Sequence, residues 1–320
     1  MSAPQSTVPA PQPAPQPVPQ PALQPALQRA GEATGRADAG RRARRRVRAA
    51  VLTAAALAVP AGASPALAAS AAPAAAGAPA ARPAPVRYAA LGDSYSSGVG
   101  TGRTDAGASC RRSSLAYPRL WTAAHPGSTV SFLACSGAGL PRVLAQQVTA
   151  VPKDAGLVTV TAGGNDVGFS AVVGVCALAS SDTACRFAVG LAKVVAVTEV
   201  PVALGATLAA IKYRAPHARI VVLGYPHLFE LGSCPAAVPS VNRRKAINDG
   251  ADTLDGAISR TASAFGAQFV DVRARFAGHG LCAPAGQSWI NGPERGPDAY
   301  HPTATGQARG YLPALTAVTG

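Results

Sequence analysis

The chain has few aromatic and few charged residues for its length: 5% and 14% of 320 residues. The shortage is most complete at the start, because residues 2–28 contain no aromatic and no charged side chain. Such a segment has little apolar surface to bury, so burial cannot offset the conformational entropy that ordering removes. We therefore expect this part of the chain to be disordered.

The sequence also lacks a basic patch interleaved with aromatic residues, the feature that binding of single-stranded nucleic acid requires. The formal net charge is +14, but residues 1–68 hold 8 of the 29 basic and 2 of the 15 acidic residues. The remainder carries +8, on scattered arginines. This charge favours anionic surfaces in general, and we expect no nucleic-acid partner.

No CxxC pair is present, which argues against a zinc site. All six cysteines follow residue 68, and an even number in an exported chain predicts three disulfides. Sequential pairing closes short loops between elements, and it is the pairing that we expect: Cys110–Cys135, Cys176–Cys185 and Cys234–Cys282. The sequence predicts no metal.

A basic run, a short apolar stretch and an A-x-A triplet follow one another in the order of a secretion signal. They lie at residues 41–48, 49–60 and 66–68, so we expect cleavage after Ala68 and a secreted, extracellular protein. A basic arm before a linker does not explain this order, and the apolar stretch is shorter than the roughly 20 residues of a membrane span. We divide the chain into a disordered extension with its signal, an Ala/Pro-rich linker and a folded domain: residues 1–68, 69–84 and 85–320.

Short apolar runs alternate with longer helical patterns in the folded part. This alternation predicts an α/β domain with a parallel sheet. The expected strands are Val86–Leu91, Thr129–Ala134, Leu157–Thr161, Arg219–Leu223 and Ala267–Val272. The expected helices are Tyr117–His125, Phe187–Tyr213 with interruptions at Pro201 and Gly205, Ser240–Phe265 capped by Ser240, and Thr303–Val318. The long apolar helix carries charges and a proline, so we expect it to be a core or lid helix rather than a membrane span.

Small, polar, glycine-containing segments follow the first three expected strands. They read GDSYSSG from Gly92, CSGAG from Cys135 and GGND from Gly163. Ligands of parallel sheets bind beyond the carboxyl ends of the strands. These segments are therefore expected to meet at one site.

Ser94 lies where the first strand ends, and small neighbours leave its hydroxyl free to project into a cleft. Gly137 offers an unobstructed backbone N–H, and Asn165 offers a side-chain amide. With the N–H of Ser94 these groups are candidate donors to a developing oxyanion. The alternatives are a helix-capping serine and a tight turn built on Gly and Asn.

Asp298 and His301 lie three residues apart near the C-terminus, a spacing that places both on one side of a turn. The carboxylate is expected to hold one imidazole nitrogen and direct the other at Ser94, as in a Ser–His–acid triad. His279 is the rival base, and His227 could line the same cleft. We favour His301 because it alone has an acid three residues before it.

The order GDSYSSG, Gly137, GGND and a late DxxHP resembles the four blocks of the SGNH (GDSL-type) hydrolases, over nearly all of residues 85–320. The six cysteines and the GYP after the fourth strand resemble the secreted bacterial lipases, esterases and phospholipases. The resemblance implies a three-layer α/β/α flavodoxin-like domain with five parallel strands. It also implies Ser94 as nucleophile, His301 as base, Asp298 as its orienting acid, and Gly137 and Asn165 as oxyanion donors. In some relatives a backbone carbonyl replaces the acid.

The combined reading is a serine esterase that needs no metal or organic cofactor. The apolar stretches Phe169–Leu178 and Phe187–Ala210 favour lipid or medium-to-long acyl esters, if they line an acyl groove rather than the core. A carbohydrate acetyl esterase and a non-catalytic module that binds lipid or polysaccharide are the alternatives. We expect a monomer with transient contact to a lipid surface.

Overall fold

A five-stranded parallel sheet forms the centre of the fold, with its strands in the order β2-β1-β3-β4-β5. The structure is a computed structural model that describes residues 84–105, 108–178, 180–234 and 238–320. The predicted extension and signal, and the linker up to residue 83, lie outside these residues. The strands are β1 Arg87–Gly92, β2 Thr129–Phe132, β3 Leu157–Thr161, β4 Arg219–Leu223 and β5 Gln268–Val270.

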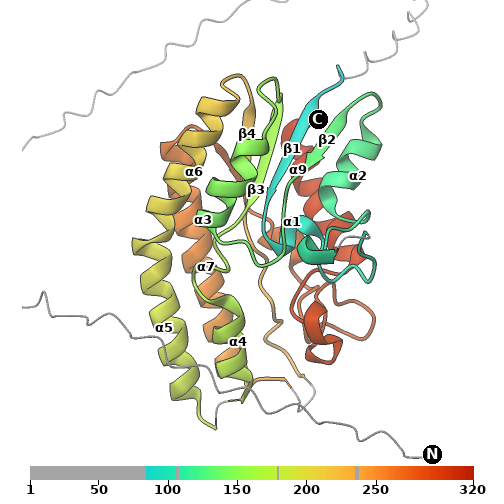
Figure 1. Ribbon diagram of the computed structural model, residues 1–320. Coiled ribbons are helices and arrows are strands. Elements are labelled where there is room, and N and C mark those ends of the chain that lie inside the picture. The colour runs from blue at the N-terminus through green and yellow to red at the C-terminus, as the bar shows by residue number, and fades with distance from the viewer. Residues whose placement is uncertain (1–83, 106–107, 179, 235–237) are drawn as a thin grey trace, which may run out of the picture. The chain divides into compact units, whose positions relative to one another are not determined.

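The three central strands are buried on both faces. Every residue of β3 is buried, as are all residues of β1 and β4 after the first. Continuous apolar runs of this kind arise because helices cover both sides of a parallel sheet. Figure 1 shows this arrangement, with α2 and α9 on one side of the sheet and α3, α6 and α7 on the other. The predicted α/β class and parallel sheet are confirmed.

The helices account for most of the remaining chain. They are α1 Ser94–Ser97, α2 Tyr117–Ala124, α3 Leu140–Arg142, α4 Phe169–Leu178, α5 Asp182–Thr198, α6 Val200–Arg214, α7 Val241–Ala264, α8 Arg273–Phe276 and α9 Leu312–Thr319. Short 3-10 or π turns lie at Ala108–Cys110, Val143–Gln147, Val148–Ala150, Pro293–Asp298 and Gly306–Tyr311. Ser240 caps α7 as predicted, because its Oγ accepts from the N–H of Arg243 at 3.4 Å.

The long apolar segment Phe187–Tyr213, expected to be helical with an interruption at Pro201, belongs to two helices, α5 and α6, which meet at Glu199. Pro201 lies in the first turn of α6, where its missing N–H leaves no helical bond unmade. The predicted interruption at Gly205 is wrong. Gly205 continues α6, and the ring of Phe265 packs so close to it that a Cβ at this position would lie 2.8 Å from the ring.

Within Asp182–Arg214 a stretch of 18 residues reaches a mean hydropathy of 2.0, and the segment is long enough to cross a membrane. Length and composition alone are weak evidence, because core helices of soluble proteins share them. The inner faces of α5 and α6 are buried against the domain, through residues that include Val189, Ala196, Leu204 and Leu208. The outer face of α5 carries exposed apolar side chains.

Three disulfides have the predicted sequential pairing. Cys110–Cys135 joins the loop after α1 to the segment after β2, and Cys176–Cys185 joins the end of α4 to the start of α5. Cys234–Cys282 links two loops that follow β4 and α8. Each bond therefore fixes a loop or helix beyond the carboxyl ends of the strands.

Candidate active site

The chain turns sharply between β1 and α1, which places Ser94 at the carboxyl end of the sheet. Gly92 adopts φ +127°, and a Cβ there would lie 2.2 Å from the carbonyl oxygen of Thr161. Only glycine fits this close approach of two backbones. The Asp93 carboxylate then accepts from the N–H of Tyr95 at 2.9 Å and starts α1 at Ser94.

Ser94 and His301 meet across 207 residues of sequence. The distance from His301 Nε2 to Ser94 Oγ is 2.8 Å, and Ser94 is only 8% exposed. His301 Nδ1 lies 2.8 Å from the carbonyl oxygen of Ala299. A carbonyl accepts only, so Nδ1 carries the proton and Nε2 accepts from the serine hydroxyl.

The prediction that Asp298 holds the imidazole is wrong. The Asp298 carboxylate instead forms an ion pair with the guanidinium of Arg111, which also donates to the carbonyl of Pro297 at 3.0 Å. Tyr300 adopts φ +62°, so the chain between Asp298 and His301 leaves the helical path on which residues three apart share a face. The backbone carbonyl of Ala299 takes the place that the acid was expected to fill.

The surroundings of His301 keep its imidazole neutral. Burial lowers the pKa of His301 below its ordinary value of 6.5, and the charge of Arg111 lowers it further. The Ala299 carbonyl and the Asp298 carboxylate act in the opposite direction without reversing the shift. A neutral imidazole at neutral pH is the form that accepts a proton.

The loops after β2 and β3 carry the two other predicted site residues. Asn165 is exposed, and its Nδ2 donates to the carbonyl of Ala138 at 3.1 Å. Gly137, also exposed, adopts φ +74° with open space where a side chain would stand. The Asp166 carboxylate accepts from the N–H of Leu140 at 3.0 Å and joins the two loops a second time.

The buried side chain of Tyr225 contacts two segments of the site, the start of α1 next to Ser94 and the loop after β3. The hydroxyl of Tyr225 donates to the Asp93 carboxylate at 2.5 Å and accepts from the N–H of Gly164 at 3.0 Å. Burial raises the pKa of Tyr225, so the hydroxyl stays protonated and donates. Burial also raises the pKa of Asp93 to about 7, while the bond from Tyr225 opposes that rise.

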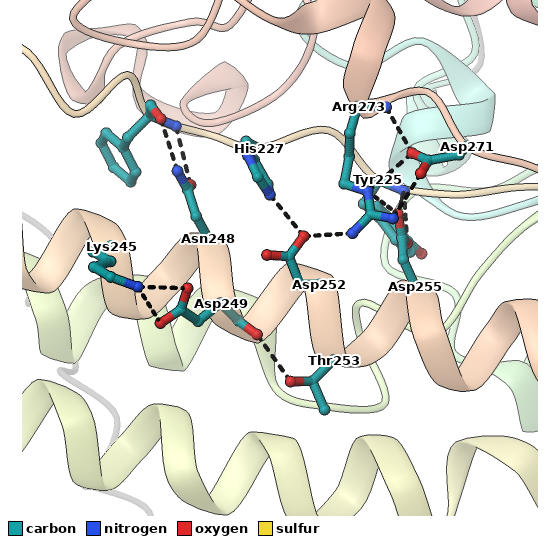
Figure 2. A network of polar contacts seen from close by, with 11 residues as sticks. Tyr225, His227, Lys245, Asn248, Asp249, Asp252, Thr253, Asp255, Asp271 and Arg273 are labelled. Atoms are coloured by element: carbon teal, nitrogen blue, oxygen red, sulfur yellow. Dashed lines mark hydrogen bonds and ion pairs between the residues drawn. The ribbon is translucent and has the colours of Figure 1, made fainter.

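Tyr225 is itself held from below by α7. Its backbone N–H donates to the buried Asp255 carboxylate at 2.9 Å, and the guanidinium of Arg273 lies 3.8 Å from the same carboxylate (Figure 2). Burial raises the pKa of Asp255 to about 8, against the effects of the Tyr225 N–H and Arg273. Sequence reasoning did not assign a role to Tyr225. The GYP segment after the fourth strand was a signal for its position, but not for its partners.

The two other candidate histidines, His227 and His279, are engaged elsewhere. His227 Nε2 lies 2.7 Å from the carboxylate of Asp252, in the network around Arg273 (Figure 2). His279 stacks on Trp289 with 3.6 Å between ring centroids, and its Nδ1 lies 2.8 Å from the carbonyl of Gln287. In the part of the chain that the structure describes, neither histidine hydrogen-bonds to Ser94, so the structure favours His301 over its rival.

An apolar pocket opens beside Ser94 and Asn165. Its walls come from the loop after β3, α4, α5 and α7, and from the segment after β4. The apolar lining residues include Val167, Phe169, Val172, Val173, Val189, Ala192, Ala196, Leu228, Ile247, Ala251 and Leu254. Both apolar stretches singled out in the sequence therefore contribute to the pocket, whereas Leu204, Leu208 and Ile211 of α6 belong to the core.

The sequence is similar to a known protein family and to characterised relatives. Residues 90–309 match the model of the GDSL-like Lipase/Acylhydrolase family. A lipase of Streptomyces rimosus is 43% identical over 234 residues, 72% of this chain and 86% of the lipase, and Lipase 1 of Streptomyces coelicolor is 42% identical over 71% and 85%.

Solved structures agree in fold. The crystal structure of the extracellular lipase from Streptomyces rimosus has a TM-score of 0.70 and 43% identity, covering 73% of this chain and 100% of the lipase. Phospholipase A1 from Streptomyces albidoflavus NA297 has a TM-score of 0.69 and 42% identity, covering 73% and 99%. The chain belongs to the GDSL-like lipase/acylhydrolase family and is a carboxylic ester hydrolase.

Proposed function

We propose that the chain is a secreted lipase or phospholipase that hydrolyses medium-to-long acyl esters through an acyl-enzyme on Ser94. The observation that carries this proposal is the 2.8 Å contact from His301 Nε2 to Ser94 Oγ beside an apolar pocket. Residues 85–320 form the catalytic domain. Three disulfides and an extracellular relative support export.

The first half-reaction acylates the serine. His301 Nε2 takes the hydroxyl proton as Ser94 Oγ attacks the ester carbonyl and forms the tetrahedral intermediate. The carbonyl of Ala299 still accepts from Nδ1 and stabilises the imidazolium. The backbone N–H groups of Ser94 and Gly137 and the amide of Asn165 donate to the oxyanion. The imidazolium then protonates the leaving alcohol as the bond from carbon to the alcohol oxygen breaks.

The second half-reaction returns the enzyme to its starting state. Water gives a proton to His301 Nε2 as its oxygen attacks the acyl-enzyme carbonyl. The same donors hold the second oxyanion. The proton passes back to Ser94 Oγ as the acid leaves, so all the atoms of one ester and one water are accounted for.

The pocket favours long acyl groups over acetyl groups. Its wall is largely aliphatic, and burying each methylene of a chain there contributes about 0.8 kcal/mol. A carbohydrate acetyl esterase, the alternative, gains nothing from such a wall. One relative is a phospholipase A1, which extends the proposal to phospholipids.

Ser94→Ala is expected to lower kcat for p-nitrophenyl esters by at least about 10³-fold, because no nucleophile remains. Ser97→Ala is the matched control. Ser97 is a buried serine of the same helix, with its hydroxyl 3.4 Å from the Ser94 carbonyl. The thermal midpoints of both variants are compared with that of the wild type. Wild-type turnover by a folded Ser94→Ala protein would refute the proposed nucleophile.

Asp298→Asn is expected to reduce kcat by less than about tenfold, because the Ala299 carbonyl still orients the imidazole. The pH profile of kcat/KM rises as His301 loses its proton, with a midpoint below 6.5. Removing the Asp298 charge, which raises this pKa, moves the midpoint to lower pH. Arg111→Gln removes a positive charge that lowers the pKa of His301, so this variant moves the midpoint to higher pH. A loss of about 10⁴-fold in Asp298→Asn would instead indicate a carboxylate-held imidazole.

The rate across p-nitrophenyl esters of increasing chain length is expected to peak well beyond the acetate. Ala192→Phe places a ring in the pocket wall and should shift the optimum to shorter chains while leaving acetate hydrolysis within about threefold. Ala209→Phe, on α6 outside this pocket, is the control. An optimum at acetate in the wild type would favour the acetyl esterase alternative.

A further inference from the structure

The outward faces of α4 and α5 expose a group of large apolar side chains. On α5, Phe187, Leu191 and Val194 are 69%, 55% and 57% exposed and recur at the spacing of one helical face. On α4, Val175 and Leu178 are 41% and 88% exposed. Single exposed apolar residues are ordinary, whereas a row of them indicates a contact surface. We call these five residues the apolar face.

The apolar face and the pocket are two sides of one wall. Val189, Ala192 and Ala196 line the pocket from the opposite side of α5, and the Cys176–Cys185 disulfide joins α4 to α5. Figure 1 shows α4 and the first half of α5 extending past the carboxyl ends of the strands, the end of the sheet at which α1 lies. Only helix α5 therefore separates a surface that contacts the apolar face from the pocket that opens at Ser94.

Two cations lie along one edge of the apolar face. Arg186 and Lys193 are seven residues apart on α5, which places them about 20° apart around the helix. In the part of the chain that the structure describes, neither forms an ion pair with a carboxylate. Asp182 is bound by Arg243, Ser240 and Asn242, and no acidic residue follows it in α5.

The charges distinguish between occupants of this face. A symmetric contact with a second copy would bring the cations of two α5 helices together without a carboxylate of that helix between them, and like charges across an interface are unfavourable. An anionic lipid surface complements both features, because it accepts apolar side chains below its headgroups and attracts cations at its phosphates.

We propose that the apolar face, with Arg186 and Lys193 at its edge, docks the enzyme on anionic phospholipid surfaces and presents the pocket to them. This inference rests on the proposed function. Docking through the apolar face supplies the route by which an acyl chain reaches Ser94 with little exposure to water. Phe187 and Leu191 enter the boundary between headgroups and acyl chains. Arg186 and Lys193 pair with phosphate groups.

The test measures binding to phosphatidylcholine vesicles, with and without phosphatidylglycerol, by co-sedimentation. Hydrolysis is prevented by Ser94→Ala in every protein used for binding. The test variant is Phe187→Gln/Leu191→Gln. The matched control is Val202→Gln/Tyr213→Gln, which removes two large side chains from α6 that are even more exposed, at 74% and 92%.

The test variant is expected to bind anionic vesicles at least tenfold more weakly than its parent, whereas the control binds like the parent. Arg186→Gln/Lys193→Gln is expected to abolish the preference for phosphatidylglycerol and the weakening of binding by salt. With Ser94 restored, all variants should hydrolyse p-nitrophenyl acetate at the wild-type rate, because none of the changed residues lines the pocket.

Unchanged vesicle binding by the test variant would overturn the proposal, as would equal loss in the control. A dimer in solution that Phe187→Gln/Leu191→Gln dissociates would overturn it in favour of a second copy. The two proposals fail separately. A wild type that hydrolyses long soluble esters but ignores vesicles refutes only the docking surface, and one that binds vesicles but hydrolyses no ester refutes only the proposed function.

Discussion

The buried hydrogen bonds of the Tyr225 hydroxyl are the constraint on which the site depends. This one group joins the carboxylate that begins α1 to the backbone of the loop that carries Asn165, with distances of 2.5 Å and 3.0 Å. A hydrogen bond contributes about 0.5–1.5 kcal/mol between neutral groups and about 1.5–3 kcal/mol when one partner is charged, as Asp93 is above its pKa of about 7. Because Tyr225 is in turn fixed to α7 through Asp255, the ends of β1, β3 and β4 are held in one arrangement before any substrate binds.

The chemistry at His301 follows from a backbone contact rather than from a buried carboxylate. The Ala299 carbonyl fixes the imidazole tautomer, and the nearby pair of Asp298 and Arg111 brings two opposite charges that shift the pKa of His301 in opposite directions. Burial then decides the direction of the shift, toward a neutral base. In such a site the Asp298 carboxylate adjusts the pH range in which His301 acts as a base, whereas the backbone carbonyl of Ala299 orients the ring.

Local patterns in the sequence predicted the parallel sheet and its strand ends, because a short apolar run followed by glycine indicates a buried strand and its end without knowledge of distant residues. They also placed Ser94, Gly137 and Asn165 at neighbouring loops. The partners of Asp298 and Tyr225 were beyond such reasoning. Arg111 is 187 residues from Asp298, and Asp93 is 132 residues from Tyr225. The short spacing to His301 favoured the wrong partner, because it assumed a helical turn that the backbone at Tyr300, with φ +62°, does not follow.

The most direct measurement compares the second-order rate of phosphonylation of Ser94 by a small fluorophosphonate in Tyr225→Phe and Tyr88→Phe. Both variants lose one buried phenolic hydroxyl, but that of Tyr88 contacts Thr159, 2.6 Å away in the core. If the Tyr225 junction holds the site together, the first variant reacts about tenfold more slowly and the second at the wild-type rate. Equal rates in the two folded proteins would contradict the account.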